Sequence, residues 1–517
     1  MPKDDCPIID VHSHAFNARY VPMRRVIKAR MWKKGPWGPV ALLANSLGIL
    51  DASAALLATS TPKTTTQRDV QWAGVRAYLA KRGMDEKNDA HLFEAITHKP
   101  AVPPRLVWNF DSSSRGNPED MGPFTWASYR LFGNETLVRL AANAFVNDPV
   151  GIASFGVSFM SHESDLFKRM QRLQPGVDLF VYENMDLVPS FYHGTQTQAY
   201  SYSKEKPGDG AESAVMHIRK LRAESKGKMI TFVAWNPFRS MNWEKGSVHS
   251  MEIVKREIEK GASGVKFYPP FGYRPAQNDF SKFKRPFFLS EARGQWNNRY
   301  LGNHPSGDEA AIMAARAKEL DALNEELFAW CADKQIPIFT HCNDGEFRAF
   351  DSEEYGDCAN PKYWEPVLAK HPNLKLCFGH AGGTADWYGE HRPRKEHVHK
   401  SAGWGALVRQ FCLDYPNVYC EFGIHEEATD PVHAEHFHRS LVKLLPLRGK
   451  GGWTLGDKVM YGSDFFMPAQ VSWGNYLCGF QKLFSLPGLT QYKARFFAGN
   501  ALNYLNAKKR PRITVSR

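Results

Sequence analysis

Several features are missing from this 517-residue sequence, and each absence excludes a class of protein. Its 8 cysteines form no Cys-x-x-Cys pair, and a chain this long needs no disulfide framework, so we expect them to be reduced. The opening stretch MPKDDCPIIDVHSHAF carries acidic residues and lacks the apolar segment of a secretory signal. No zinc-finger spacing, RNA-binding signature, internal repeat or low-complexity linker is present. These absences predict a cytoplasmic protein that binds no nucleic acid.

Basic residues exceed acidic ones, with 66 Lys and Arg against 54 Asp and Glu. Part of the excess lies in residues 24–34, and part lies in residues 508–517, which we predict to be a basic tail. A solvated surface explains this balance more simply than a nucleic-acid site, and it also suits an anionic small-molecule substrate.

One apolar stretch, residues 40–59, is long enough to span a bilayer, but it contains Asn45 and Asp51. A carboxylate at the centre of a membrane helix costs about 2.5–3.5 kcal/mol, so we expect a buried helix or helical hairpin at this position. The alternative is a peripheral membrane contact through residues 24–59.

Short apolar, β-branched runs alternate with helical patterns, which predicts parallel β/α units. The runs that we interpret as strands are 8–14, 177–183, 229–235, 263–269, 336–341, 374–380, 417–423 and 458–464. Five helices are predicted between or after them, at 248–260, 308–334, 402–414, 433–446 and 489–505. Eight strands close a (β/α)8 barrel, so the predicted fold is an α/β TIM barrel with large helical insertions after strands 1 and 4.

In this scheme, residues 1–14 and 176–507 form the barrel. Residues 15–175 are predicted to be a mainly helical cap or an oligomerisation region, and residues 270–307 a loop near the site. Such excursions from the carboxyl ends of barrel strands usually form lids and substrate-binding walls. A homo-oligomer is compatible with this organisation.

Candidate metal-binding side chains follow the predicted strands. Asp10, His12 and His14 alternate at the end of the first strand, which predicts that all three point to one side. His341, His380 and Asp464 stand at the ends of the fifth, sixth and eighth strands. Because these ends converge on one face of a barrel, the histidines and Asp464 predict a metal site rather than a set of unrelated core residues.

The pattern IIDVHSHAF, GVKFYPPFGY, IPIFTHC, LKLCFGHAGG, VMYGSDFFMP and ARFFAGNALNYL resembles the amidohydrolase superfamily. It is similar in style to the branch of TIM-barrel metal-dependent hydrolases that includes aminocarboxymuconate-semialdehyde decarboxylase. The resemblance implies that His12 and His14 are metal ligands and that His341 and His380 bind a second ion in binuclear members. In mononuclear members His341 is a ligand and His380 acts on the substrate. Asp464 is then both a ligand and the catalytic proton acceptor.

Lys266 ends the fourth strand, where dihydroorotase-like members carry a lysine carboxylated by CO₂. Such a carbamate would bridge two metal ions and make Lys266 a ligand. The alternative is an unmodified cation that binds an anionic substrate or pairs with Asp464, and the sequence does not separate the two.

Imidazole and carboxylate ligands suit Zn²⁺, as one or two ions, with Mn²⁺ or Fe²⁺ as substitutes. The expected activity is hydrolysis of a C–N or C–O bond (amide, cyclic amide, lactone or ester) of a small, anionic and partly apolar molecule. The alternatives are a non-oxidative decarboxylase or hydratase, and a binding module that has lost activity.

Three further residues are candidates for substrate binding. Arg239 follows the third strand, and Tyr268 and Tyr273 flank the end of the fourth. A surface salt bridge is an equally good explanation for the arginine, and packing explains the tyrosines.

Other residues near the predicted strand ends have supporting roles. Glu421 on the seventh strand is a candidate to support the site, and Gly382 and Gly383 are expected to let the backbone approach it. Cys342 is expected to point away from the site.

Overall fold

The protein is described by a computed structural model that covers part of the chain. The described residues are 7–15, 163–187, 214–241, 248–283, 296, 300–301, 308–344, 348–349, 352–388, 403–429, 431–465 and 473–506. Most of the 15–175 insertion, the 24–59 stretch, much of 270–307 and the 508–517 tail lie outside them. The predictions made for those segments therefore stay predictions.

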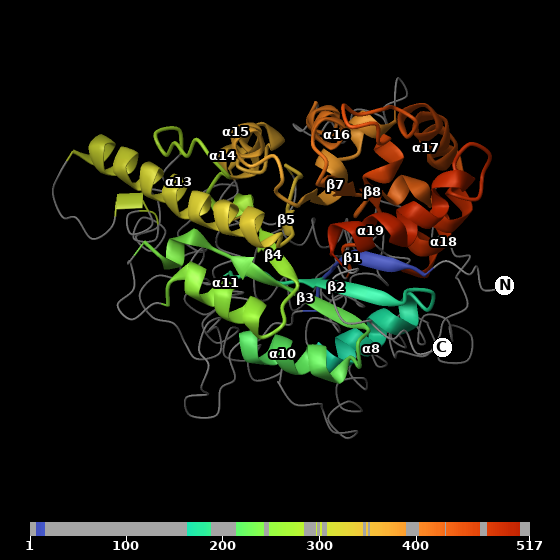
Figure 1. Ribbon diagram of the computed structural model, residues 1–517, viewed down its shortest axis with the longest axis horizontal. Coiled ribbons are helices and arrows are strands. Elements are labelled where there is room, and N and C mark those ends of the chain that lie inside the picture. The colour runs from blue at the N-terminus through green and yellow to red at the C-terminus, as the bar shows by residue number, and fades with distance from the viewer. Residues whose placement is uncertain are drawn as a thin grey trace, which may run out of the picture.

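Eight parallel strands form one sheet in the order of the sequence, β1 to β8 (Figure 1). Their bounds are β1 Ile9–Ser13, β2 Leu179–Glu183, β3 Met229–Trp235, β4 Gly264–Phe267, β5 Ile338–Thr340, β6 Leu376–Phe378, β7 Val418–Glu421 and β8 Val459–Met460. The amide of Val11 donates to the Tyr461 carbonyl at 3.1 Å, and that of Asp464 donates to the His12 carbonyl at 2.8 Å. These bonds join the last strand to the first, so the sheet curls into a nearly closed barrel, as predicted.

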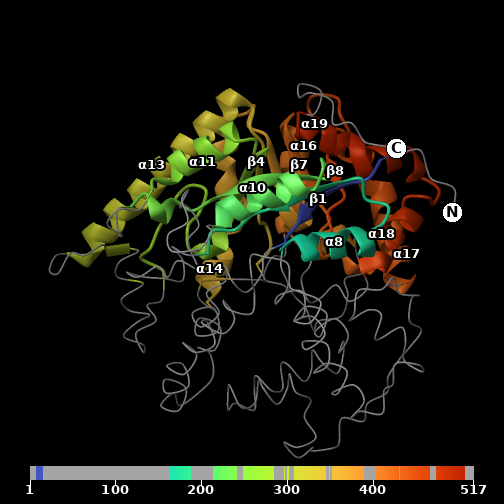
Figure 2. The same ribbon diagram turned by 90° about the horizontal axis from the view of Figure 1, so that it is seen from below.

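Helices alternate with the strands and cover the outside of the barrel. The larger ones are α8 Glu163–Leu173, α10 Ala214–Glu224, α11 Ser250–Glu259, α13 Glu309–Lys334, α16 Trp404–Asp414, α17 Pro431–Leu444 and α18 Trp473–Leu483. Shorter ones are α14 Glu353–Asp357, α15 Glu365–Lys370 and α19 Asn500–Tyr504. Figures 1 and 2 both place α11 beside α13, and an ion pair between Lys255 and Glu326 (3.6 Å) joins them.

Local chemistry explains several of these elements. The Asp308 side chain accepts hydrogen bonds from the amides of Ala310 and Ala311, which caps the start of α13 as the sequence predicts. At Gly264, a Cβ atom would lie 2.5 Å from the Phe232 ring. Glycine therefore lets the fourth strand pack closely against the third.

Two apolar layers hold the barrel together. Residues facing the barrel axis form one cluster, which comprises Ile9, Val11, Leu179, Val181, Phe232, Phe339, Cys377, Tyr419, Met460, Ala498, Ala501, Tyr504 and Leu505. The last four belong to the C-terminal helical segment, which closes the amino end of the barrel. A larger cluster lies between the strands and the outer helices. Because the interior is filled, chemistry is confined to the carboxyl ends of the strands.

All eight predicted strands and all five predicted helices overlap observed elements, apart from breaks in the last helix. That segment is divided into a turn at Thr490–Tyr492, a π-helical turn at Arg495–Gly499 and α19. Within the described part of the 15–175 insertion, α8 is helical and precedes β2. Among the described residues, no helix has both the length and the hydropathy needed to cross a membrane.

Candidate metal centre at the carboxyl end of the barrel

The side chains of His12 and His14 meet Asp464 across the junction between the first and the last strand. Oδ1 of Asp464 lies 3.2 Å from Nε2 of His12 and 3.1 Å from Nε2 of His14. Nδ1 of His14 is 2.8 Å from the carbonyl oxygen of Glu183, which fixes the orientation of that ring. The predicted convergence of residues from the two ends of the chain is therefore present in the fold.

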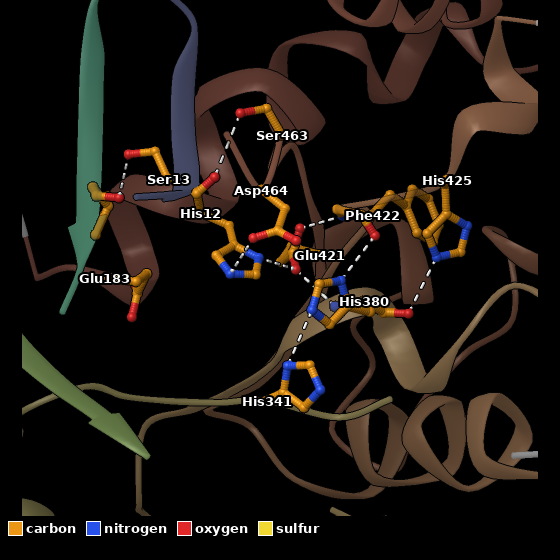
Figure 3. A network of polar contacts seen from close by, with 12 residues as sticks. His12, Ser13, Glu183, His341, His380, Glu421, Phe422, His425, Ser463 and Asp464 are labelled. Atoms are coloured by element: carbon orange, nitrogen blue, oxygen red, sulfur yellow. Dashed lines mark hydrogen bonds and ion pairs between the residues drawn. The ribbon is translucent and has the colours of Figure 1, made fainter. Parts of the chain in front are cut away.

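Glu421, at the end of β7, contacts both His12 and His380 (Figure 3). Its Oε1 lies 2.9 Å from Nδ1 of His12 and accepts a hydrogen bond of 2.7 Å from the backbone amide of His380, while Oε2 accepts one from the Gly423 amide. Burial raises the pKa of Glu421 to about 8. A carboxylate behind a histidine is the usual way of orienting a metal-ligating imidazole.

His380 and His341 complete the ring of imidazoles. Nε2 of His380 lies 3.2 Å from Nδ1 of His341, and Nδ1 of His380 lies 3.1 Å from the Gly423 carbonyl. Nε2 of His341 has no hydrogen-bond partner among the described atoms. Potential ligand atoms of His12, His380 and Asp464 all lie within 4.8 Å of one another, so this part of the cluster has the compactness of a metal site.

Burial lowers the pKa of His12, His341 and His380. For His12, the nearby Lys266 cation lowers it further. The three rings are therefore neutral, and a neutral imidazole nitrogen is the form that binds a metal ion.

The backbone at the site is held in conformations that side chains disfavour. His380, Ala381 and Asp464 have φ values of 58°, 49° and 52°, which lie in the left-handed region. Each such residue costs roughly 1–3 kcal/mol and persists where the surroundings hold it in place. Two contacts hold His380 in this conformation, because Glu421 binds its amide and Nε2 of His425 lies 3.1 Å from its carbonyl oxygen.

Lys266 ends β4 inside the barrel, as predicted. Its Nζ lies 3.4 Å from Nε2 of His12, 4.0 Å from the Glu183 carboxylate and 4.1 Å from the centre of the Phe339 ring. Burial lowers the pKa of Lys266, while the carboxylates of Glu183 and Asp464 oppose that shift. The lysine thus belongs to the same cluster as the candidate ligands.

The prediction that Asp10 shares a face with His12 and His14 is wrong. Asp10 accepts hydrogen bonds from the amide and the hydroxyl of Ser463 (2.9 and 2.5 Å) and from the side chain of Gln174. The pairing of β1 with β2 is irregular between Asp10 and Ser13, and Val11 faces the barrel axis. This break in the alternation separates Asp10 from the metal-facing side.

The three candidate substrate-binding residues lie in different surroundings. The Arg239 guanidinium forms a bidentate ion pair with the Asp186 carboxylate. The predicted alternative of a salt bridge is therefore present, but the pair is buried and does not lie at the surface. The Tyr268 ring lies 4.6 Å from that of His341, within the site. The Tyr273 hydroxyl donates to the Trp235 carbonyl at 2.8 Å in the core, which fits the packing alternative. Substrate binding by any of them remains a prediction.

The close approach at Gly382 differs from the predicted one. A Cβ atom there would lie 2.7 Å from the backbone of Trp404 and Gly405, so this glycine admits helix α16 rather than the site. Cys342 lies in the cluster between strands and outer helices, and burial raises the pKa of its thiol, as expected for a residue facing away from the site.

Sequence reasoning missed two residues of this centre. Glu183 ends β2 with its carboxylate 4.0 Å from Nζ of Lys266, and the rule used for the histidines would have found it. His425 lies behind His380 after β7, and its lone position in the sequence carries no signal.

Comparisons with known proteins match this chain to a family. Residues 249–506 match the model of the family described as Amidohydrolase, which covers α11 to α19. A search of curated proteins finds no match.

Several solved structures are similar to this chain at low sequence identity. An uncharacterised TIM-barrel protein from Bordetella bronchiseptica is 13% identical with a TM-score of 0.37, over 67% of this chain and 83% of the other. A zinc-bound amidohydrolase from Burkholderia multivorans is 12% identical with a TM-score of 0.35, over 66% of this chain and 87% of the other. A manganese-bound 5-carboxyvanillate decarboxylase from Novosphingobium aromaticivorans is 12% identical with a TM-score of 0.33, over 66% of this chain and 80% of the other. On the family match and the eight-stranded barrel, the chain is an enzyme that belongs to the amidohydrolase family.

Proposed function

We propose that the protein is a metal-dependent hydrolase that cleaves a C–N or C–O bond in a small anionic molecule. The observation that carries this proposal is the convergence of the Nε2 atoms of His12 and His14 on Oδ1 of Asp464, at 3.2 and 3.1 Å. Three potential ligand atoms around one point, at the carboxyl end of a barrel, are suited to binding a divalent cation.

The donor chemistry fits such an ion. The two imidazoles point their Nε2 atoms inward because their Nδ1 atoms lie against Glu421 and the Glu183 carbonyl. His341 adds a buried nitrogen that has no hydrogen-bond partner among the described atoms. We therefore assign His12, His14 and Asp464 as residues that would hold the ion, with His380 and His341 as the further candidate ligands beside them.

Zinc is the metal that we propose, since neutral imidazoles with one carboxylate suit it, and manganese or iron are the alternatives. When bound, the ion supplies a Lewis acid and a water whose pKa is near 7. The number of ions depends on the chemical state of Lys266.

Two side chains of the protein then transfer the protons of the reaction. Asp464 has its carboxylate at the centre of the cluster, where it accepts the proton of the attacking water and later delivers it to the leaving group. His380 is neutral with its Nδ1 against the Gly423 carbonyl, so its Nε2 carries a lone pair and can accept a second proton. General acid–base catalysis of this kind contributes about 10²–10⁴-fold.

We infer a cytoplasmic enzyme with a small-molecule substrate and no nucleic-acid partner, in which residues 15–175 serve as a cap or an oligomer contact. The ring of Tyr268 beside His341 supports a partly apolar substrate. Deletion of residues 30–60 is expected to change either turnover or assembly state.

The test of function starts from metal content. Purified protein is dialysed, reloaded with zinc, measured for stoichiometric metal, and assayed against amides, cyclic amides, lactones and esters in ¹⁸O-labelled water. Zinc-dependent turnover with one ¹⁸O atom in the product supports the proposal. Release of CO₂ without ¹⁸O incorporation would replace it with the decarboxylase alternative, and a protein that binds no transition metal would point to a binding module.

A further inference from the structure

The side-chain nitrogen of Lys266 lies near two groups that attract positive charge. These groups are the Glu183 carboxylate at 4.0 Å and the face of the Phe339 ring at 4.1 Å. A carboxylate is an anion, and the face of an aromatic ring is the negative end of its quadrupole. Nε2 of His12 lies 3.4 Å away, but its lone pair is the one that would bind the metal ion. This surrounding suits an ammonium group.

The surroundings of Glu183 also indicate that Lys266 is a cation. Its side chain is fully buried, and neither carboxylate oxygen has a hydrogen-bond partner among the described atoms. Lys266 is the cation paired with it. Burial raises the pKa of Glu183, and the Lys266 cation opposes that shift, so the lysine favours the charged form of this carboxyl group.

A carbamate on Lys266 would fit this surrounding poorly. It would add a carbon and two oxygens beyond a nitrogen that is already close to His12, Glu183 and Phe339. It would also place a second negative charge beside Glu183 and against the negative face of the ring. The same surroundings therefore stabilise a cation on Lys266 and destabilise an anion there.

We propose that Lys266 stays an unmodified cation, held in place by Glu183, and binds the anionic group of the substrate beside the metal. The proposal rests on the proposed function and assigns the residue that recognises the anion. Glu183 is the positioning residue in this pair. The contact between Nζ and His12 brings the lysine to the edge of the metal site, within reach of a carboxylate that lies next to the ion.

Binding of a simple carboxylate tests the proposal without a known substrate. Benzoate is titrated calorimetrically into zinc-loaded protein, with benzamide as the neutral probe of the same shape. In Lys266→Met the Kd for benzoate is expected to rise roughly 10- to 100-fold, because a charge-assisted bond is lost, while the Kd for benzamide stays within about twofold. An unchanged benzoate Kd would overturn the proposal.

Matched variants guard against loss of folding. Lys458→Met removes another buried lysine, which binds the Pro416 carbonyl far from the metal centre, and is expected to leave benzoate binding unchanged. If Lys266→Met alone does not fold because Glu183 is left unpaired, the double variant K266M/E183Q removes both charges and takes its place. Lys266→Arg keeps the charge and is expected to keep the Kd within about threefold of the wild-type value.

The chemical state of Lys266 is read directly by ¹³C NMR after equilibration with ¹³C-bicarbonate. We expect no carbamate carbon signal in the wild type and a single zinc ion in each chain. A carbamate signal that Lys266→Met lacks would overturn the proposal even if zinc binding and hydrolysis are present. Absence of zinc binding would instead overturn the proposed function, and the same benzoate comparison on the zinc-free protein would still decide the role of Lys266.

Discussion

The barrel interior has two regions with opposite chemistry, although both are made by the same strands. Toward the amino ends of the strands it is apolar, with Leu179 and Val181 on β2 and Tyr419 on β7. Two positions further along, the same two strands present Glu183 and Glu421, both fully buried. A strand therefore changes from stabilising the fold to carrying chemistry within two residues.

Buried polar atoms without hydrogen bonds occur at the polar end of these strands. Among the described residues, both oxygens of Glu183 and Nε2 of His341 lack hydrogen bonds, and both residues lie at the carboxyl ends of strands. The apolar region is filled by hydrocarbon and aromatic side chains, and the C-terminal segment closes it. The apolar region contributes hydrophobic packing to the fold, and the carboxyl ends of the strands carry the buried ionisable groups.

The largest expected effect is on the polar end. Asp464→Asn keeps the size of the side chain but removes the negative charge and the proton acceptor at the centre of the cluster. Turnover is expected to fall about 10²–10⁴-fold, with weaker zinc retention, measured by initial rates and metal analysis of dialysed protein. Asp333→Asn, an exposed residue on α13 paired with Lys334, is the control and should match the wild type. Equal turnover in both variants would remove Asp464 from the mechanism.

A substitution in the apolar region is expected to lower the stability of the protein and to leave metal binding unchanged. Leu179→Ala leaves a cavity among the axial side chains and should lower the free energy of unfolding by about 2–5 kcal/mol, measured by denaturant titration. Zinc stoichiometry of the folded protein should not change. Leu447→Ala, at a leucine that is 45% exposed, should change stability by less than about 0.5 kcal/mol. Loss of zinc from Leu179→Ala at temperatures where it is folded would contradict this separation.

The sequence is sufficient to predict the strands and the polar region because both follow rules of short range. A buried parallel strand is a short apolar run, and the residue that ends it faces the carboxyl end of the barrel. That rule places His341, His380 and Asp464 in one cluster, and the structure confirms their proximity. Applied to the second strand, the same rule identifies Glu183.

The errors arise where tertiary contacts override the local pattern. Asp10 leaves the metal-facing side because β1 is irregular between Asp10 and Ser13, which depends on pairing with strands far along the chain. A side chain at Gly382 would collide with the first residues of α16, so the glycine is explained by the packing of that helix. The role of His425 depends on its contact with the His380 carbonyl, which no spacing in the sequence encodes.

A variant at the boundary between the two regions should give an intermediate effect. Glu421→Gln retains the shape behind His12 and His380 but weakens the acceptor that orients them. We expect zinc affinity to fall about 10–100-fold, as for other groups that support metal ligands, measured by competition with a chelating dye. Glu326→Gln on α13, where the ion pair with Lys255 is exposed, is the control. Wild-type affinity in Glu421→Gln would mean that the Gly423 carbonyl and the barrel alone orient the histidines.

The smallest effect is expected from the buried lysine at the amino end of the barrel. Lys458, next to β8, places its ammonium group against the Pro416 carbonyl and the rings of Tyr419 and Trp453, and burial lowers its pKa to about 8. Between this value and the ordinary 10.5, the unfolded chain binds more protons than the folded protein. Stability should therefore rise with pH there, by about 1 kcal/mol from pH 8 to 9.

Lys458→Met removes this titration, so the stability of the variant relative to the wild type should decrease by that amount across the same interval. Because the buried charge destabilises the fold fully only below the folded pKa, the variant should compare best with the wild type below pH 8 and worst above the ordinary lysine pKa. Denaturant titrations at several pH values measure this difference. A difference that does not depend on pH would show that Lys458 keeps an ordinary pKa, and that burial at this end of the barrel leaves its charge hydrated.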